Sequence, residues 1–141
     1  MLHLARASIV LIALAVPLGL PAYAESPAAP ATERDQVPAQ VLSFEGEEAL
    51  RALAAKGTTV VFFYANWCPN CRATVTELNE RWDEVRPGLN LVIADYDKEQ
   101  ALKAKYGVTY QDTFVLLDKD ANAVDVWNSG GVDGLNAHTG A

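Results

Sequence analysis

Cysteine is scarce in this sequence: the chain of 141 residues holds only two, Cys68 and Cys71, with two residues between them. One such pair cannot build a disulfide-rich scaffold, so the fold has to depend on a hydrophobic core. The hydrophobic content of 50% is ample for one domain of this length. Since the sequence also lacks internal repeats, we expect a single folded domain.

Positive charge is scarce as well. The chain has 11 lysines and arginines against 18 aspartates and glutamates, a formal net charge of -7. Phosphate backbones and anionic lipid surfaces attract basic proteins, so an acidic domain is a poor candidate for binding either. We therefore expect no nucleic-acid partner.

A long unbroken apolar run is the third feature that the sequence lacks. The apolar stretch at residues 9–20 is interrupted by Pro17 and Gly19 and is short for a membrane span of about 20 residues. It follows Arg6 and leads into a small-x-small motif ending at Ala24, which is the arrangement of a secretory signal peptide. We expect cleavage after Ala24 and a periplasmic or otherwise exported, soluble protein; the alternative is an uncleaved anchor.

The mature chain then begins with a segment that does not favour folding. Residues 25–40 consist mostly of proline, alanine, serine and charged residues, and such a composition cannot offset its own ordering entropy. No cysteine follows the cleavage site directly, which excludes a lipoprotein anchor, and loss of Arg6 takes the formal net charge from -7 to -8. We interpret residues 1–24 as the signal peptide, 25–40 as a tether and 41–141 as the domain.

Helix and strand patterns alternate within the domain. Residues 58–64 form a continuous apolar, β-branched and aromatic run, which is typical of a strand buried on both faces of a parallel sheet. Strands are further predicted at 90–94, 113–117 and 123–127, and helices at 45–56, from the cysteine pair to Pro87, at 100–106 and at 132–138. The first two strands and their helix form a right-handed βαβ unit, and the last two strands an antiparallel hairpin. The fold class is therefore α/β.

The cysteine pair lies in the segment WCPNC, residues 67–71, where the buried strand turns into a helix. Cys68 is thus expected at the helix N-terminus, where free backbone N–H groups and the helix dipole stabilise a thiolate. Pro69 suits the first helical turn because its missing N–H has no partner there. We predict that Cys68 attacks and that Cys71, one turn further along, resolves the mixed disulfide.

Three features together resemble the thioredoxin superfamily over residues 41–135: the stretch VVFFYANWCPNC, the βαβ unit, and the later segment KYGVTYQDTFVLLD. The resemblance implies a thioredoxin-like fold, a mixed five-stranded sheet flanked by helices on both faces, with a short C-terminal helix. It also implies thiol–disulfide exchange at Cys68 and Cys71 on protein substrates, with no bound cofactor. We expect a monomer that takes electrons from a membrane thiol donor.

Two departures from the thioredoxin pattern concern the movement of protons. The family usually carries a buried acid six residues before the first cysteine, but Phe62 stands there, and no lysine is present near Ile93. The proton relay assigned to that acid therefore needs solvent or a different group.

A third departure concerns the loop that faces the cysteines. The family places a cis-proline before a threonine, and this chain has Asp112 before Thr113. A cis bond before a non-proline residue costs about 3–4 kcal/mol, so a trans bond is expected. A carboxylate beside Cys68 would raise the pKa of that thiol and make the protein a better reductant. Alternatively, Asp112 only hydrogen-bonds within its own loop.

Other interpretations of the same residues remain open. The cysteines could form a static disulfide or hold copper or zinc in a metal-delivery protein, although His138 is the one histidine after the signal. Gln111 could present its backbone to a substrate peptide. Asp95 and Asp97 are better suited to capping than to acid–base work. The candidate groove or tuning residues are Trp67, Pro69, Asn70, Gln111, Asp112 and Thr113.

Overall fold

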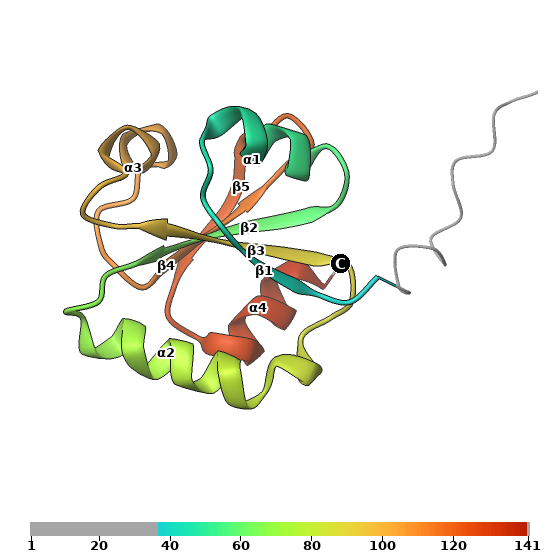
Figure 1. Ribbon diagram of the computed structural model, residues 1–141, viewed down its shortest axis with the longest axis vertical. Helices are drawn as coiled ribbons and strands as arrows, with labels where there is room; N and C mark the ends of the chain where they lie inside the picture. Colours follow the sequence, from blue (N-terminus) through green and yellow to red (C-terminus); the bar gives the residue numbers. More distant parts are fainter. Residues whose placement is uncertain (1–36, 141) are drawn as a thin grey trace, which may run out of the picture.

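A twisted five-stranded sheet runs through the middle of the structure, a computed structural model that describes residues 37–140 (Figure 1). The strands lie in the order β1-β3-β2-β4-β5. Their bounds are β1 (Gln40–Ser43), β2 (Thr58–Tyr64), β3 (Leu89–Asp95), β4 (Thr113–Leu117) and β5 (Ala123–Asn128). The first three strands are parallel to one another, while β4 is antiparallel to both β2 and β5. The predicted mixed five-stranded sheet is confirmed.

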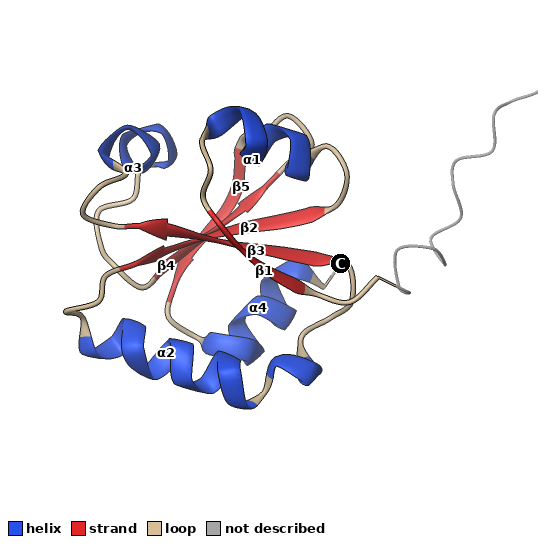
Figure 2. Ribbon diagram, viewed as in Figure 1, coloured by secondary structure: helices blue, strands red, loops and turns tan. Residues whose placement is uncertain are grey.

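Helices cover both faces of this sheet (Figures 1 and 2). On one face, α1 (Glu47–Ala54) and α3 (Gln100–Tyr106) contribute to a core around Leu50 and Leu102. On the other face lie α2 (Pro69–Glu80), a 3-10 turn η2 (Trp82–Glu84) and α4 (Gly131–Thr139), with Leu78 and Leu135 in the core. The predicted α/β arrangement is confirmed.

Strand β2 is the centre of the domain. It pairs with β3 on one side and β4 on the other, and Val60 to Phe63 have no exposed surface. Phe62 points to the α2 and α4 side, where its ring stacks on Phe114 at 4.3 Å between centroids. Phe114 in turn stacks on Trp127 at 5.4 Å. The strand that leads to the cysteine pair is thus buried in the core over most of its length.

The start of the domain lies a few residues earlier than residue 41. Gly88 donates its N–H to the carbonyl of Val37 at 2.6 Å, and Gln40 already belongs to β1 and donates its side-chain amide to Asn90 at 2.6 Å. Residues 37–40 therefore pack on the domain, because their backbone meets hydrogen-bonding partners that composition does not reveal. The signal peptide and most of the tether, residues 1–36, lie outside the described residues. Among the described helices, none combines the length and apolarity that crossing a bilayer requires.

Several helix bounds also differ from the sequence prediction. The first helix spans Glu47–Ala54 rather than 45–56, with Gly46 (φ 106°) as its N-cap, and α4 spans Gly131–Thr139 rather than 132–138. The helix after the cysteines stops at Glu80 and continues as η2, instead of reaching Pro87. Its apolar spacing continues through Trp82 because η2 keeps the same face toward the sheet.

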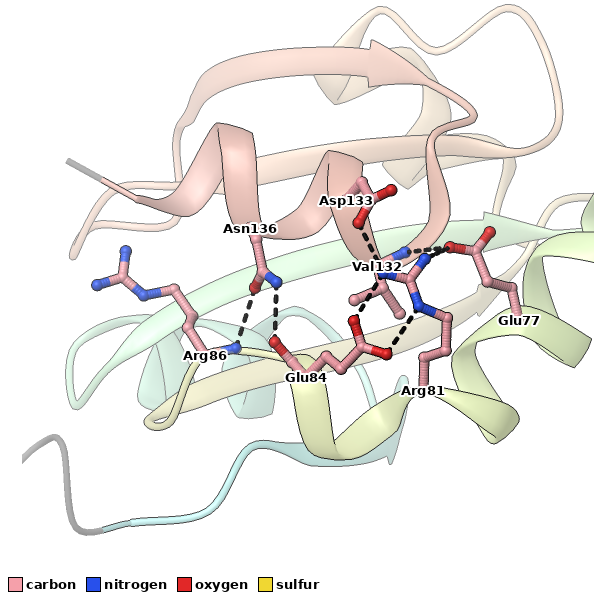
Figure 3. Close-up of polar contacts among 7 residues, drawn as sticks. All are labelled: Glu77, Arg81, Glu84, Arg86, Val132, Asp133 and Asn136. Atoms are coloured by element: carbon pink, nitrogen blue, oxygen red, sulfur yellow. Dashed lines mark hydrogen bonds and ion pairs between the residues drawn. The ribbon is translucent and has the colours of Figure 1, made fainter.

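Polar side chains join α4 to α2 and η2 (Figure 3). Arg81 forms ion pairs with Glu77, Glu84 and Asp133 at 2.7–2.8 Å. Asn136 accepts the backbone N–H of Arg86 at 3.0 Å and donates to the carbonyl of Glu84 at 2.8 Å. The short C-terminal helix is thus fixed in place by the chain itself.

We expect the substitution Asn136→Ala to lower the free energy of unfolding by about 1 kcal/mol, since two hydrogen bonds to backbone groups are lost. The gain in helix propensity from alanine, about 0.5 kcal/mol, offsets part of the loss. Urea unfolding followed by circular dichroism measures the change. The exposed Asn79 of α2 provides the matched control. An Asn79→Ala variant as destabilised as Asn136→Ala would contradict this role of Asn136.

Candidate active site

The cysteine pair occupies the junction of β2 and α2. Cys68 is the N-cap residue of α2, and its Sγ accepts the backbone N–H of Cys71 at 3.4 Å. Pro69 is the first helical residue, as the sequence predicted. Both cysteines are free thiols; Cys68 is 2% exposed and Cys71 has no exposed surface. The partly buried rings of Tyr64 and Tyr96 pack against the pair.

The two thiols have opposite electrostatic environments. Burial raises the pKa of Cys68, but hydrogen bonds from the backbone and thiol of Cys71, the backbone of Asn70 and the side chain of Gln111 outweigh it. The net pKa of Cys68 is below the ordinary value of 9.0. A thiolate at the end of a helix that accepts several donors is the form prepared for nucleophilic attack.

Cys71 is held as a neutral thiol. Burial is the largest cause that raises its pKa to about 11; a backbone hydrogen bond with Ala65 opposes it, while Cys68 and the charge of Asp112 add to it. The sequence analysis expected a carboxylate at position 112 to raise the pKa of Cys68. The net pKa of Cys68 is instead lowered, because the donors at the helix start outweigh burial, and the charge of Asp112 is among the causes that raise the pKa of Cys71.

Asp112 is fixed in the loop before β4. The described chain contains no cis peptide bond, so the bond from Gln111 to Asp112 is trans, and Asp112 has a φ of 61°. Its N–H donates to Phe63 at 3.0 Å, its carbonyl accepts the N–H of Ser129 at 2.8 Å, and Oδ2 accepts the hydroxyl of Ser129 at 2.8 Å. The side chain, 2% exposed, therefore does more than complete a turn in its own loop.

An open, polar hollow of about 420 Å³ lies beside this carboxylate. It separates the start of α2 from the start of α4, and we call it the polar hollow. Its lining residues are Asn70, Ala73, Thr74, Glu77, Asp112, Ser129, Gly130, Gly131 and Asp133. Asn70, a predicted groove residue, is thus exposed at its edge.

Trp67, the residue before Cys68, is exposed. Its side chain is 53% exposed, and its indole N–H donates to Asp97 Oδ2 at 2.8 Å. Asp95 accepts the backbone N–H groups of Asp97 and Lys98 and so closes the turn after β3; it does not cap α3, whose N-cap residue is Glu99. Trp67 is therefore available for contact with a partner, and Asp97 holds its ring in position.

Asn128 and Ser129 organise the loop before β4, and neither was a predicted site residue. Asn128 donates its side-chain amide to the carbonyls of Gln111 and Asp112 and to the hydroxyl oxygen of Thr113, at 2.9–3.2 Å. The carbonyl of Gln111 is thus already engaged. Both residues reach this loop through the hairpin register, which pairs Thr113 with Asn128 and which the sequence alone does not fix.

The structure does not place His138 as a metal ligand beside the cysteines. His138 stacks on Trp127 at 4.2 Å and pairs with Asp125 at 2.6 Å. Within residues 37–140, no group of three histidine, cysteine or acidic side chains is arranged to hold a metal ion. His138 is therefore a packing residue of α4.

A lowered-pKa thiol at the start of a helix, with a buried second thiol one turn away, defines the class of thiol–disulfide oxidoreductases. The family model described as Thioredoxin matches residues 40–138. The chain therefore belongs to the thioredoxin family, whose members act on protein thiols and disulfides.

Individual relatives agree with this membership. Thioredoxin Asp f 28 of Aspergillus fumigatus is 32% identical over 89 residues, 61% of this chain and 78% of the relative. A thioredoxin of Fasciola hepatica is 28% identical in sequence, with a TM-score of 0.55 over 64% of this chain and 86% of its own. Thioredoxin NaTrxh of Nicotiana alata, 22% identical, shares the fold with a TM-score of 0.59 over 72% and 90% of the two chains.

Proposed function

We propose that this protein is an exported reductase of protein disulfides in which Cys68 is the nucleophile and Cys71 the resolving thiol. The observation that carries the proposal is the contrast between the two sulfurs. The pKa of Cys68 is lowered by donors at the start of α2, while that of Cys71 is raised to about 11. One thiol is therefore ready to attack a substrate, and the other stays protonated until a mixed disulfide has formed.

The reducing direction is supported by the relatives, which are named as thioredoxins. Thioredoxin has a reduction potential of about −270 mV, whereas a strong periplasmic oxidant lies near −120 mV. The lowered pKa of Cys68 acts against this direction, since a stabilised thiolate favours the reduced protein by about 30 mV for each pKa unit below ambient pH. The reducing direction therefore rests on the likeness to thioredoxins and not on the pKa of Cys68.

Export and electron supply complete the proposal. The signal peptide predicted at residues 1–24 delivers a soluble, monomeric domain to the periplasm or an equivalent compartment. There, reduction of substrates requires a donor, which we assign to a membrane protein that carries thiol electrons. N-terminal sequencing of the exported protein tests the cleavage predicted after Ala24.

The substitution Cys71→Ser tests the reaction itself. Without the resolving thiol, we expect substrate proteins to remain disulfide-linked to Cys68 in the compartment where the full chain is expressed. Non-reducing electrophoresis and mass spectrometry identify the trapped adducts, and the Cys68→Ser variant serves as the matched control. Absence of adducts from an intact, exported Cys71→Ser protein would contradict thiol–disulfide exchange. A potential near that of the strong oxidants would contradict the reducing direction alone.

A further inference from the structure

The resolving thiol has to lose a proton before it can react. Cys71 is fully buried, and burial and its neighbours raise its pKa to about 11, so only a minute fraction is thiolate at neutral pH. Position 62, in strand β2, is a phenylalanine packed in an aromatic stack. Some other group has to accept the proton of Cys71.

Asp112 has the geometry for this task. It is 2% exposed, and its Oδ1 is buried without a hydrogen-bond partner among residues 37–140. The other oxygen, Oδ2, is held by the hydroxyl of Ser129, and both backbone polar groups of Asp112 are engaged with Phe63 and Ser129. These contacts hold the carboxylate in place. Its Oδ1 can accept a proton without the loss of an existing hydrogen bond.

A buried polar atom without a partner is uncommon in folded proteins and calls for a functional explanation. Asp112 lines the same hollow as Asn70 and Thr74, which flank Cys71 in α2, and its charge is among the causes that raise the pKa of Cys71. This polar hollow opens to solvent. The carboxylate thus lies between the thiol that loses a proton and the route by which the proton can leave.

We propose that Asp112 is the proton acceptor for Cys71 in the resolving step, an inference that rests on the proposed thiol–disulfide exchange. The S–H bond of Cys71 breaks as its proton passes to Asp112 Oδ1, and the new thiolate attacks the Cys68 sulfur. A bond forms between the two cysteine sulfurs while the bond from Cys68 to the substrate breaks. The substrate sulfur leaves as a thiolate with that electron pair, so the substrate is reduced and the cysteine pair oxidised by two electrons each.

This transfer also resolves the electrostatic conflict in the site. A Cys71 thiolate beside an ionised Asp112 would place two negative charges in a buried space. Because the proton moves between them, only one of the two groups carries the charge at any time. The proton on Asp112 then passes through the polar hollow to solvent, which restores the carboxylate.

Few other titratable groups surround the pair. Tyr64 and Tyr96 pack against the cysteines, and Glu77 and Asp133 lie across the polar hollow. Both of these acids are paired with Arg81. Asp133 therefore provides a matched control: an acid at the same hollow, with a side chain 80% exposed and engaged elsewhere.

Rapid mixing of the reduced full domain with limiting 4,4′-dithiodipyridine separates the two steps. Attack by Cys68 releases one thiopyridone, and attack by Cys71 on the mixed disulfide releases a second in a concentration-independent phase. The reagent is uncharged, so a change of charge at position 112 does not alter its approach. Each phase is recorded for the native protein, D112N, D112E and D133N as a function of pH.

We expect D112N to keep the rate of the first phase within about twofold of the native rate. The second phase should be about 10- to 100-fold slower than in the native protein at pH 7. General bases contribute about 10²- to 10⁴-fold, and the expected loss lies at or below the lower limit of this range because D112N also removes a charge that raises the pKa of Cys71. The rate of the second phase of the native protein should be nearly independent of pH around neutrality. In D112N it should rise about tenfold per pH unit, following the thiolate fraction of Cys71.

The controls distinguish proton transfer from a structural role. D112E is expected to keep the flat pH profile at a reduced rate, and D133N to behave as the native protein. A loosened fold changes rates but cannot convert a flat profile into a tenfold slope. Equal second phases in D112N and the native protein, or equal slowing in D133N, would overturn the role of Asp112. A native protein that releases no second thiopyridone would instead contradict the exchange reaction itself.

Discussion

Placing an acid at position 62, by Phe62→Asp, is expected to unfold the domain at neutral pH. Phe62 has no exposed surface and stacks on Phe114 at 4.3 Å, so its loss leaves a cavity in the central core. Truncating a buried phenylalanine costs about 3–5 kcal/mol, and burying a polar group without a partner costs about 2–7 kcal/mol more. The sum matches the whole stability of a typical domain, about 5–15 kcal/mol.

Urea unfolding followed by tryptophan fluorescence and circular dichroism measures this loss. The control is Phe62→Leu, which keeps the site apolar and should cost about 1.5 kcal/mol or less. The introduced carboxyl should destabilise the fold more as pH rises above about 4, because burial favours its neutral form. A Phe62→Asp protein that unfolds cooperatively near the native midpoint would show that this core accepts an acid.

The aromatic stack thus explains why position 62 is not free to supply a proton acceptor. Its ring belongs to a continuous series, Phe62, Phe114 and Trp127, that connects the centre of the sheet to α4. An acid at position 62 would remove the ring of Phe62 and its stacking contact with Phe114. The proton acceptor is therefore expected outside the central core, on the loop side of the pair.

The sequence predicted the elements whose pattern is set by burial on both faces. Residues 58–64 are β-branched or aromatic throughout because β2 is paired on both edges and covered on both faces over most of its length, and the structure has the same bounds. Strand β1 gives no such pattern, because its four residues lie at the sheet edge and are mostly exposed. Edge position therefore removes the periodicity that sequence analysis needs.

The candidate site also has one part that local sequence predicts and one part that it does not. The helix start at Cys68 and Pro69 follows from local chain geometry, and the sequence predicted it. The effect of Asp112 depends on which of two sulfurs its carboxylate approaches, and on Ser129, which comes from a different strand end. The hairpin between them has a register shift at Leu116 and Leu117, which the sequence gives no means to place. Long-range side-chain placement was therefore beyond prediction.

The second large effect is expected in thiol reactivity: iodoacetamide should modify Cys68 and leave Cys71 intact in the reduced protein at pH 7. Only the thiolate reacts, and a thiol with a pKa of about 11 is about 10⁻⁴ ionised at that pH. Cys68, with its pKa below 9.0, has a much larger thiolate fraction. We expect the free thiol of the Cys68→Ser variant to react at least about 100-fold more slowly than that of Cys71→Ser.

The pH profiles of the two variants give the sign of each shift. The rate for Cys68 in Cys71→Ser should level off below pH 9, because its backbone donors remain even when the Cys71 thiol is removed. The rate for Cys71 in Cys68→Ser should rise about tenfold per pH unit to beyond pH 9, since burial, the largest cause of its raised pKa, is unchanged. In denaturant, both thiols should titrate alike near their ordinary value. Equal alkylation rates in the two folded variants would contradict the assignment of Cys68 as the nucleophile and Cys71 as the protonated resolving thiol. A Cys71 that ionises as easily as Cys68 would need no proton acceptor.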